Sequence, residues 1–485
     1  MALTAAAGPA MLGGGGELRM AGNSPRGIAV VDAGSTNTKV VLFDGAGTAV
    51  AERQIASRHV EGPPYRHIDP EPVVAFAQEF LPELDRILPV DAVVPCAHGA
   101  ALACLAADGS LALPIMDYTA VPPPEAVAEY RRIGPPFSEV FAPLLPMALT
   151  HALQLYWQER DFPDAFERIA TVIPWIQYVG FRLCGAAAGE ISGMSAQSHL
   201  IDVRHNRLSS LVRSRGWERL FPPMVKAWEE IGTLKPEFRA TGFRGAGRVL
   251  AGVHDSTANY LRYRAGGLDH FTLLSTGTWI IAFDSATPVE RLDAARDTAT
   301  NTDVFGRPVA CSRFFGGHEF EILAAGAPGD AASIADAARL VAAGIFALPS
   351  FTNSGGPVPG SGGRGRVEGG LPAAAAERAS LASLYCALMV SEQLDAVGSR
   401  HDIVVDGPFA RNAVFLGLLA ALRRGQNVLA SELRDGTTAG AACLALMRDG
   451  TLPHVELRLL PIRAAAIDGL AAYRYVWRKR AGLAG

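Results

Sequence analysis

A pair of short apolar runs around a polar turn, near the start of the chain, constrains the fold more than any other stretch. Residues 28–31 and 40–43 are rich in β-branched side chains, and residues 32–39 between them are mostly polar. Two such runs around a turn predict a β-hairpin. Gly34 lets the backbone turn tightly and leaves no side chain in the way of a ligand. From its residues alone, the turn is either an ordinary polar surface loop or a site for phosphate oxygens.

The turn holds three kinds of group that bind phosphate. Its side-chain donors, which act beside the backbone amides, are Ser35, Thr36, Asn37 and Thr38. Lys39 can place a point charge on a phosphate. Asp32, at the end of the first run, can hold a Mg²⁺ ion that bridges phosphates. We therefore expect a magnesium–phosphate site at this turn if the stretch is functional.

A second stretch repeats this pattern. Residues 271–283 comprise an apolar run, a turn with Thr276 and Gly277, and another apolar run. Two such hairpins, separated by a domain's length, indicate two related halves. After the first hairpin, residues 48–56 predict a third strand, so the start of the chain is a β-meander and not the strand–helix unit of a dinucleotide site.

Length and composition limit the class of protein. A chain of 485 residues predicts two or three domains. The net charge of −4 lacks the basic excess that is typical of nucleic-acid-binding proteins. We find no apolar run long enough to span a bilayer. The six cysteines form no C-x-x-C pair, which is typical of free thiols in a reducing compartment and predicts a cytoplasmic protein. Residues 1–25, rich in alanine and glycine, are expected to be disordered and not a signal peptide, and Met20 is an alternative start.

Polar residues at predicted strand ends are the next candidates. The apolar run 91–96 leads into His98 and Gly99, and the predicted strand 111–116 ends at Asp117. Such positions often line sites in α/β sheets. The alternative is structural: His98 is a satisfied loop residue, and Asp117 starts a turn or caps the next helix.

A further acid lies at the start of a predicted helix. Residues 249–252 predict a strand, and His254 and Asp255 open an alanine-rich helix. An acid at a helix start is stabilised by the helix dipole, so Asp255 is either a cap or a catalytic carboxylate. Elsewhere we expect helices at 72–88 and 377–398, a mainly helical region at 143–193, and strands at 402–406 and 427–430.

Together, these motifs resemble the FGGY family of carbohydrate kinases, in the superfamily of sugar kinases, actin and heat-shock chaperones. The markers occur in the family's order: the first phosphate turn, His98-Gly99, Asp255, the second phosphate turn, and an adenosine motif around Gly407. The resemblance covers residues 28–446. It implies an α/β fold of two actin-like, ribonuclease H-like domains, each a mixed sheet flanked by helices, with an ATP cleft between them. Residues 26–265 would bind sugar, and residues 266–485 would bind ATP.

The resemblance also implies an activity and a set of site residues. The activity is ATP-dependent phosphorylation of a sugar hydroxyl, with Asp255 as the general base and ATP and Mg²⁺ as cofactors. The implied metal ligand is Asp32. The implied sugar contacts are His98, Gly99, Asp117 and His254. The implied nucleotide contacts are Ser35, Thr36, Asn37, Lys39, Thr276, Gly277, Gly407, Arg411 and Asn412.

The sequence leaves the substrate open. Residues 254–257 and 316–320 look most like kinases of six-deoxy ketoses, L-fuculose and L-rhamnulose. Two positions depart from the family pattern. Thr119 stands where the family usually has an arginine two residues after the aspartate, and Asp406 replaces the first of two glycines. A pentulose or polyol kinase is an alternative, and so is a non-catalytic ATP-binding sugar sensor. We expect no nucleic-acid or membrane partner, and a homodimer stays open.

Overall fold

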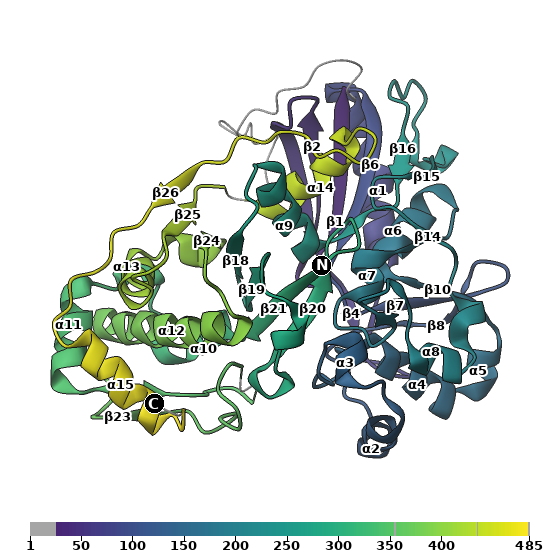
Figure 1. Ribbon diagram of the computed structural model, residues 1–485. Coiled ribbons are helices and arrows are strands. Elements are labelled where there is room, and N and C mark those ends of the chain that lie inside the picture. Colours follow the sequence, from purple (N-terminus) through teal and green to yellow (C-terminus); the bar gives the residue numbers. More distant parts are fainter. Residues whose placement is uncertain (1–25, 354–355, 434, 484–485) are drawn as a thin grey trace, which may run out of the picture. The chain divides into compact units, whose positions relative to one another are not determined.

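The computed structural model describes residues 26–353, 356–433 and 435–483 (Figure 1). The chain forms two compact units. Unit 1 comprises Met1–Gly267, Asn301–Pro308 and Gly436–Glu456; unit 2 comprises Leu268–Thr300, Val309–Asp435 and Leu457–Gly485. The division begins next to the expected boundary at residue 265, but two later stretches join unit 1. The segment 1–25, expected to be disordered, lies outside the described residues.

Unit 1 is built on one mixed sheet with the strand order β15-β16-β6-β1-β2-β3, and β17 pairs with β6. The strands are β1 Gly27–Ala33, β2 Asn37–Asp44, β3 Ala49–Ala56, β6 Val90–Ala97, β15 Glu230–Thr233, β16 Arg248–Leu250 and β17 Val253–His254. The first three form the expected antiparallel meander. Strand β6 pairs with β1 in parallel, and β16 and β17 both pair with β6 in parallel.

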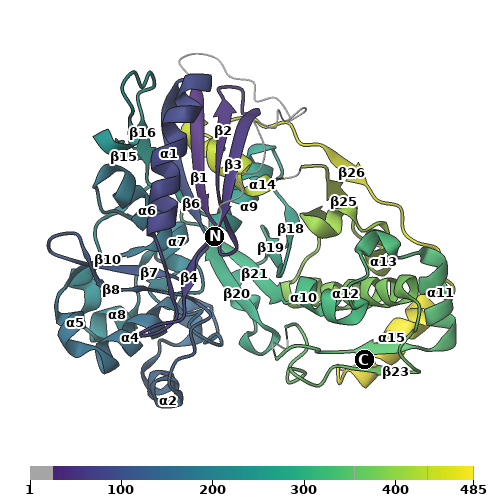
Figure 2. The same ribbon diagram turned by 180° about the vertical axis from the view of Figure 1, so that it is seen from behind.

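Helices cover both faces of this sheet (Figures 1 and 2). On one face, α1 (Glu71–Ile87) and α6 (Trp175–Cys184) pack on alternate β1 residues, including Ala29 and Val31. On the other, α9 (Asp255–Ala265) packs against α14 (Gly436–Leu446). The two helices are so close at Gly440 that an added Cβ would lie 1.8 Å from the Ala258 oxygen. This close packing places a helix from the last fifth of the chain in unit 1.

Two small sheets adjoin this core. One is β4 (His59–Val60), β5 (His67–Ile68) and β9 (Ile115–Met116); the other is β10 (Ile169–Pro174), β7 (Leu102–Ala106) and β8 (Leu111–Leu113). The single strand expected at 111–116 is therefore wrong: Pro114, which has no N–H for a ladder, separates two strands that join different sheets. The helical expectation for 143–193 is wrong at β10, whose β-branched residues pair with β7.

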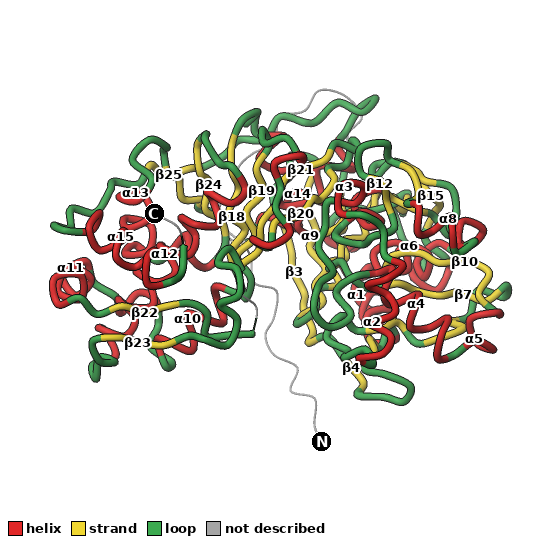
Figure 3. Tube along the Cα trace, turned by 60° about the horizontal axis from the view of Figure 1, so that its bottom comes forward, coloured by secondary structure: helices red, strands yellow, loops and turns green. Residues whose placement is uncertain are grey.

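The remaining elements of unit 1 are short or peripheral. They are α2 (Pro124–Ile133), α3 (Phe137–Val140), α4 (His151–Asp161), α5 (Pro163–Glu167), α7 (Ile191–Ser195), α8 (Ser210–Ser214), β11 (Gly189–Glu190), β12 (Ile201–Asp202), β13 (Arg207–Leu208) and β14 (Met224–Val225). Figure 3 shows that each unit contains both helices and strands.

Unit 2 repeats the central arrangement. Its sheet has the strand order β20-β21-β19-β18-β24-β25-β26. The strands are β18 Phe271–Thr276, β19 Ile280–Asp284, β20 Thr298–Thr302, β21 Pro308–Phe314, β24 Asp402–Asp406, β25 Val428–Ser431 and β26 Leu459–Pro461. The β18–β19 hairpin is antiparallel, and β24 runs parallel to β18. This is the relation that β6 has to the β1–β2 hairpin, so the two-halves expectation is confirmed at the level of strand pairing.

Helix α12 (Ala375–Val397) forms the centre of the helical layer of unit 2, close to the expected 377–398. It packs against α10 (Gly316–Ala324), α11 (Ile334–Ala343) and α13 (Ala413–Leu422). The other elements are β22 (Phe346–Leu348), β23 (Arg366–Glu368) and α15 (Leu470–Arg480). Across the residues placed in the structure, no helix has the length and apolarity to cross a membrane.

Candidate active site

The carboxyl ends of three parallel strands meet at one edge of the unit 1 sheet. Asp32 near the end of β1 pairs with Cys96 in β6, and Val253 in β17 pairs with Cys96 from the other side. Because parallel strands end at the same edge, the sheet brings Asp32, His98 and Asp255 to one region of unit 1. Asp117 follows β9 of a separate small sheet, and its neighbour Tyr118 contacts this region at Ser35 and His98.

The turn after β1 has an unusual hydrogen-bond arrangement. Four successive carbonyl oxygens each accept a hydrogen bond from a donor outside the turn. They belong to Ala33 (from Trp175 Nε1, 3.3 Å), Gly34 (from Ser57 Oγ, 2.7 Å), Ser35 (from His59 Nε2, 2.8 Å) and Thr36 (from Ser57 N, 2.9 Å). The N–H groups of Ser35 and Thr36 have no acceptor within the described residues. Amides that are free in this way form a concave site for an anion.

The side chains of this turn fall into two groups. Thr36 and Asn37 are exposed, and Lys39 Nζ lies 3.7 Å from Asp32 Oδ2. Ser35 Oγ shares a hydrogen bond of 3.1 Å with the Tyr118 hydroxyl, and buried Thr38 is hydrogen-bonded to Ser57. Thr38 is thus structural, while the other side chains of the turn border the free amides.

Asp255 is the first residue of α9, and the two oxygens of its carboxylate have different surroundings. Oδ1 accepts hydrogen bonds from Ser256 N (2.5 Å) and Oγ (3.1 Å) and lies 3.3 Å from His254 Nε2. Oδ2 has no partner among the residues described, and 32% of the side chain is exposed. Because Asp255 comes after the N-cap residue His254, its Oδ1 lies at the helix start without capping the helix. Oδ2 stays available to accept a proton from a bound hydroxyl.

His254 is fixed from behind and offers one nitrogen. Its backbone N–H donates to Ser192 Oγ (3.1 Å), and Ser192 in turn donates to Glu190 Oε2 (2.5 Å). Its Nδ1 is buried without a partner in the described part of the chain. Burial lowers the pKa of His254, and the charge of Asp255 opposes this only in part. A neutral ring whose Nε2–H points to Asp255 leaves Nδ1 as a hydrogen-bond acceptor.

Gly99 and His98 lie beside this ring. A Cβ added to Gly99 would be 2.7 Å from His254 Nε2, so only glycine leaves room for the imidazole. The His98 ring packs edge-on against Tyr118, with centroids 5.6 Å apart. Burial lowers the pKa of His98, although its contact with the Gly99 oxygen and the charge of Asp255 act in the opposite direction.

Asp117 is 2% exposed and fully engaged. Oδ1 accepts from Thr119 N (2.7 Å) and Oγ1 (2.8 Å); Oδ2 lies 3.2 Å from Arg66 Nε and 2.5 Å from His59 Nδ1. Burial disfavours the carboxylate, but the bonds from Thr119 and the charges of His59 and Arg66 outweigh it and lower the pKa of Asp117. Thr119, which departs from the family pattern, is thus a partner of the aspartate.

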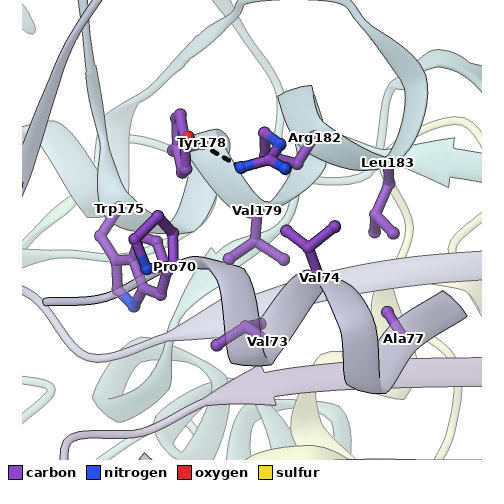
Figure 4. Close-up of a pocket in the computed structure, with 9 residues that line it drawn as sticks. All are labelled: Pro70, Val73, Val74, Ala77, Trp175, Tyr178, Val179, Arg182 and Leu183. Atoms are coloured by element: carbon purple, nitrogen blue, oxygen red, sulfur yellow. Dashed lines mark hydrogen bonds between the residues drawn. The ribbon is translucent and has the colours of Figure 1, made fainter. Parts of the chain in front are cut away.

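Sequence patterns did not select Ser192, Ser57, His59 or Trp175. Each contacts a backbone group of a selected residue or of the turn after β1, and no motif spacing marks such a role. Trp175 also lines a small apolar depression between α1 and α6, together with Val73, Ala77 and Val179 (Figure 4). The polar groups at its rim, the Tyr178 hydroxyl and the Arg182 guanidinium, are hydrogen-bonded to each other, and Arg182 also pairs with Glu71, so we interpret the depression as core packing.

In unit 2, the turn after β18 is held by β24 and the segment that follows it. Thr276 Oγ1 donates to the Asp406 oxygen (2.5 Å) and accepts from Phe409 N (3.1 Å). Gly407 has φ of 87°, and an added Cβ would lie 2.0 Å from the Thr276 oxygen. Thr276 and Gly407 are therefore in direct contact. The close approach and the positive φ explain why the second residue of the Asp406-Gly407 pair must be glycine.

The remaining expected nucleotide residues differ in their surroundings. Arg411 is exposed, with no ion-pair partner in the described ranges. Asn412 is 5% exposed and caps α13: it accepts from Phe415 N (2.9 Å) and donates to Ser383 Oγ (3.0 Å). Its amide is therefore already used inside unit 2.

No group of three or more potential metal ligands from histidine, cysteine, aspartate and glutamate occurs in the residues that the structure places. A nucleotide-bound Mg²⁺ does not need one, since it usually keeps several waters and takes one or two carboxylates plus phosphate oxygens. Asp32, beside the free amides of the turn, fits that role.

Comparisons with known proteins agree with this geometry. The family model described as "Carbohydrate kinase FGGY, C-terminal domain" matches residues 269–453. The crystal structure of a carbohydrate kinase from Novosphingobium aromaticivorans is 33% identical, covers 93% of this chain and 100% of that chain, and has a TM-score of 0.82. The chain belongs to the FGGY family of carbohydrate kinases. The expected α/β fold with two actin-like domains is confirmed.

More distant relatives differ in their substrates. An L-fuculokinase of Salmonella typhi is 24% identical over 265 residues, which cover 52% of this chain and 55% of the relative. The chain thus matches about half the length of that curated protein. A ligand-bound xylulose kinase from Lactobacillus acidophilus is 16% identical, covers 93% of this chain and 96% of its own, and has a TM-score of 0.76. At this identity, the likeness describes the fold alone.

Proposed function

We propose that the protein phosphorylates a sugar hydroxyl with ATP, using Asp255 as the general base. The observation that carries the proposal is the asymmetry of the Asp255 carboxylate. Ser256 and His254 hold Oδ1, so the carboxylate has a fixed direction, while Oδ2 is open. A general base needs this combination of a fixed position and a free lone pair.

The phosphate groups of ATP are assigned to the two turns. In unit 1, the free amides of Ser35 and Thr36 would bind phosphate oxygens, with Lys39 as a point charge. In unit 2, we assign the same task to the turn at Thr276 and Gly277, and we assign a charge contact to exposed Arg411. Mg²⁺, held through Asp32, would neutralise charge on the phosphates. Asp255 Oδ2 then takes the proton of the attacking hydroxyl.

The sugar is assigned to the histidines beside Asp255. His254 Nδ1, buried and without a partner among the described residues, can accept a hydrogen bond from a second sugar hydroxyl. His98 borders the same region, and Gly99 leaves the space. We favour a ketose such as L-fuculose or L-rhamnulose, supported by the likeness to an L-fuculokinase. Pentuloses and polyols stay as alternatives, because Thr119 departs from the family pattern.

Two further assignments rest on sequence. We propose a cytoplasmic location because all six cysteines are free and five of them are buried. We leave a homodimer as a proposal that light scattering on the purified protein would test.

The test is ADP release from Mg–ATP with a panel of acceptors: L-fuculose, L-rhamnulose, D- and L-xylulose, D- and L-ribulose, erythritol and glycerol. One acceptor is expected well above the ATP-only background. Asp255→Asn should then lose about 10²–10⁴-fold in turnover while it still binds Mg–ATP. Asp108→Asn, in a surface turn of unit 1, is the matched control and should keep full activity.

Three results would contradict the proposal in different ways. Full turnover by the Asp255→Asn variant would show that Asp255 is not the general base. Binding of Mg–ATP without stimulation by any acceptor would favour an ATP-binding sensor or an acceptor outside the panel. Failure of the wild-type protein to bind Mg–ATP would refute the assignment of the two turns to ATP binding.

A further inference from the structure

The turn that we assign to phosphate binding is connected to the segment around Asp117 through one histidine. Nε2 of His59 is 2.8 Å from the Ser35 oxygen, and Nδ1 is 2.5 Å from Asp117 Oδ2. A second contact runs beside it, because the Tyr118 hydroxyl is hydrogen-bonded to Ser35 Oγ. Two adjacent residues after β9 thus reach the same residue of the turn, one directly and one through His59.

Both ring nitrogens of His59 face an acceptor atom. The Ser35 carbonyl is only an acceptor, and Asp117, whose pKa is lowered, is an acceptor in its ionised form. Nε2 therefore donates to the Ser35 oxygen, whereas Nδ1 lies against Asp117 Oδ2 as a close contact and makes no hydrogen bond within the described residues. Asp117 is itself fixed by Thr119 and Arg66. With each of its oxygens already in contact with two polar atoms, Asp117 can bind a sugar hydroxyl only by releasing one of them.

The orientation of the turn amides follows from the geometry of the peptide bond. In a trans peptide, the C=O of one residue and the N–H of the next point in opposite directions. A donor that fixes the Ser35 oxygen therefore also directs the Thr36 N–H away from itself. In the same way, Ser57 on the Gly34 oxygen directs the Ser35 N–H. The two amides without protein acceptors are those whose preceding carbonyls are held from behind.

We propose that His59 is a positioning residue for the phosphate turn, with Asp117 as its anchor. This inference rests on the proposed function and deepens it. It assigns no substrate contact to His59; the side chain acts by keeping the Ser35–Thr36 peptide oriented so that the Thr36 amide binds a phosphate oxygen. It also changes the interpretation of Asp117 from a sugar ligand to the residue that holds His59.

Two substitutions separate the two ends of His59. The amide nitrogen of glutamine approximates Nε2, and that of asparagine approximates Nδ1. His59→Gln can still donate to the Ser35 oxygen, whereas His59→Asn can reach only Asp117. His67, on the neighbouring strand β5 of the same small sheet, is the matched control because its Nδ1 contacts only the Tyr65 oxygen nearby.

The assay is the Kd of Mg–ATP for the full-length protein by calorimetry, which needs no sugar, with adenosine as a phosphate-free probe. We expect His59→Asn to weaken Mg–ATP binding about 10-fold and His59→Gln less than 3-fold. His67→Asn should stay within 2-fold. Adenosine binding should not change in any variant. Tyr118→Phe, which removes one hydroxyl and is the least disruptive change, should weaken Mg–ATP binding 2- to 5-fold.

The outcomes are separable. If the wild-type protein binds Mg–ATP and His59→Asn and Tyr118→Phe bind it equally well, the positioning role is refuted and the proposed function stands. If His59→Asn and His59→Gln lose ATP and adenosine binding alike, His59 supports the fold in general, and the inference is again refuted. If the wild-type protein does not bind Mg–ATP, the proposed function fails and the inference fails with it.

Discussion

Glu190, which caps α7, makes the stability of unit 1 depend on pH. The side chain is 0% exposed. Oε2 accepts hydrogen bonds from Ser192 N (3.0 Å), Ser192 Oγ (2.5 Å) and Gly193 N (3.1 Å), whereas Oε1 has no partner among the described residues. Burial raises the pKa of Glu190 to about 7; the hydrogen bonds at Oε2 lower it, and the charge of Asp303 raises it further.

The size and the sign of the effect follow from linkage. A rise from the usual 4.5 to about 7 is some 2.5 pKa units, or about 3 kcal/mol at 1.36 kcal/mol per unit. Between these two pH values, the folded state binds more protons than the unfolded state, so the free energy of unfolding falls as the pH rises. The penalty is absent below about pH 4.5 and complete above about pH 7.

The assay compares urea unfolding of the wild-type protein and Glu190→Gln at pH 5 and pH 8. Glutamine keeps an acceptor for the α7 amides but cannot ionise. We expect the variant to gain about 2.5 kcal/mol relative to the wild type between the two pH values. Glu125→Gln, at an exposed glutamate of unit 1, is the control and should show no such change. A Glu190→Gln difference that is independent of pH, or that favours the wild type at pH 8, would refute the reasoning.

Two predictions concern unit 2. Gly407→Ala places a Cβ 2.0 Å from the Thr276 oxygen at a φ that favours glycine, so we expect its Mg–ATP binding, measured by calorimetry, to weaken at least 10-fold. The control Gly425→Ala, whose Cβ meets open space, should bind Mg–ATP as the wild-type protein does. Equal Kd values for Gly407→Ala and the wild-type protein would contradict this account. Glu392→Gln removes a buried carboxylate that pairs with Arg474 (3.3 Å) and Arg478, and should cost about 2–3 kcal/mol in urea unfolding because the arginines are only partly buried. Unchanged stability would contradict this prediction and show that the ion pairs do no more than offset the burial of the charge.

The sequence predicts the elements whose signals are local. The β1–β2 and β18–β19 hairpins follow from apolar runs around glycine-containing turns, and the strand-end positions of His98 and Asp255 follow from the same pattern. The resemblance then gave the order of the markers along the chain. These features need no knowledge of which distant residues come together, because each depends on a few neighbouring positions.

What the sequence does not predict is long-range. Asn412 looks like a nucleotide contact in a motif, but its amide caps α13 and bonds to Ser383. Ser57 and His59 follow β3 without any pattern, yet they hold the phosphate turn through its carbonyl oxygens. The return of α14 to unit 1 depends on the close fit of Gly440 against α9. In each case, a partner far away in sequence decides the role.

The two phosphate turns are held in different ways, and the difference bears on the substrate. In unit 2, the Thr278 oxygen accepts from the backbone N–H groups of Gly317 (3.1 Å) and His318 (3.4 Å), which lie at the start of α10. A Cβ on Gly317 would be 2.1 Å from the Gly277 oxygen, so this glycine is needed for the approach. The Thr278 oxygen of the unit 2 turn is thus held by main-chain N–H groups, whereas three of the four carbonyl oxygens in the unit 1 turn are held by the side chains of Ser57, His59 and Trp175.

Residues 316–320 were one of two reasons to favour a six-deoxy ketose. The structure gives them packing roles inside unit 2: Gly317 contacts the turn, and buried Glu319 binds Thr352 Oγ1 (2.8 Å) and the Tyr385 hydroxyl. A motif explained by packing reports the architecture of the fold and carries little information on the sugar. On the proposed function, discrimination between a ketose and a polyol would rest on the surroundings of His98 and His254, and the acceptor panel would identify the substrate.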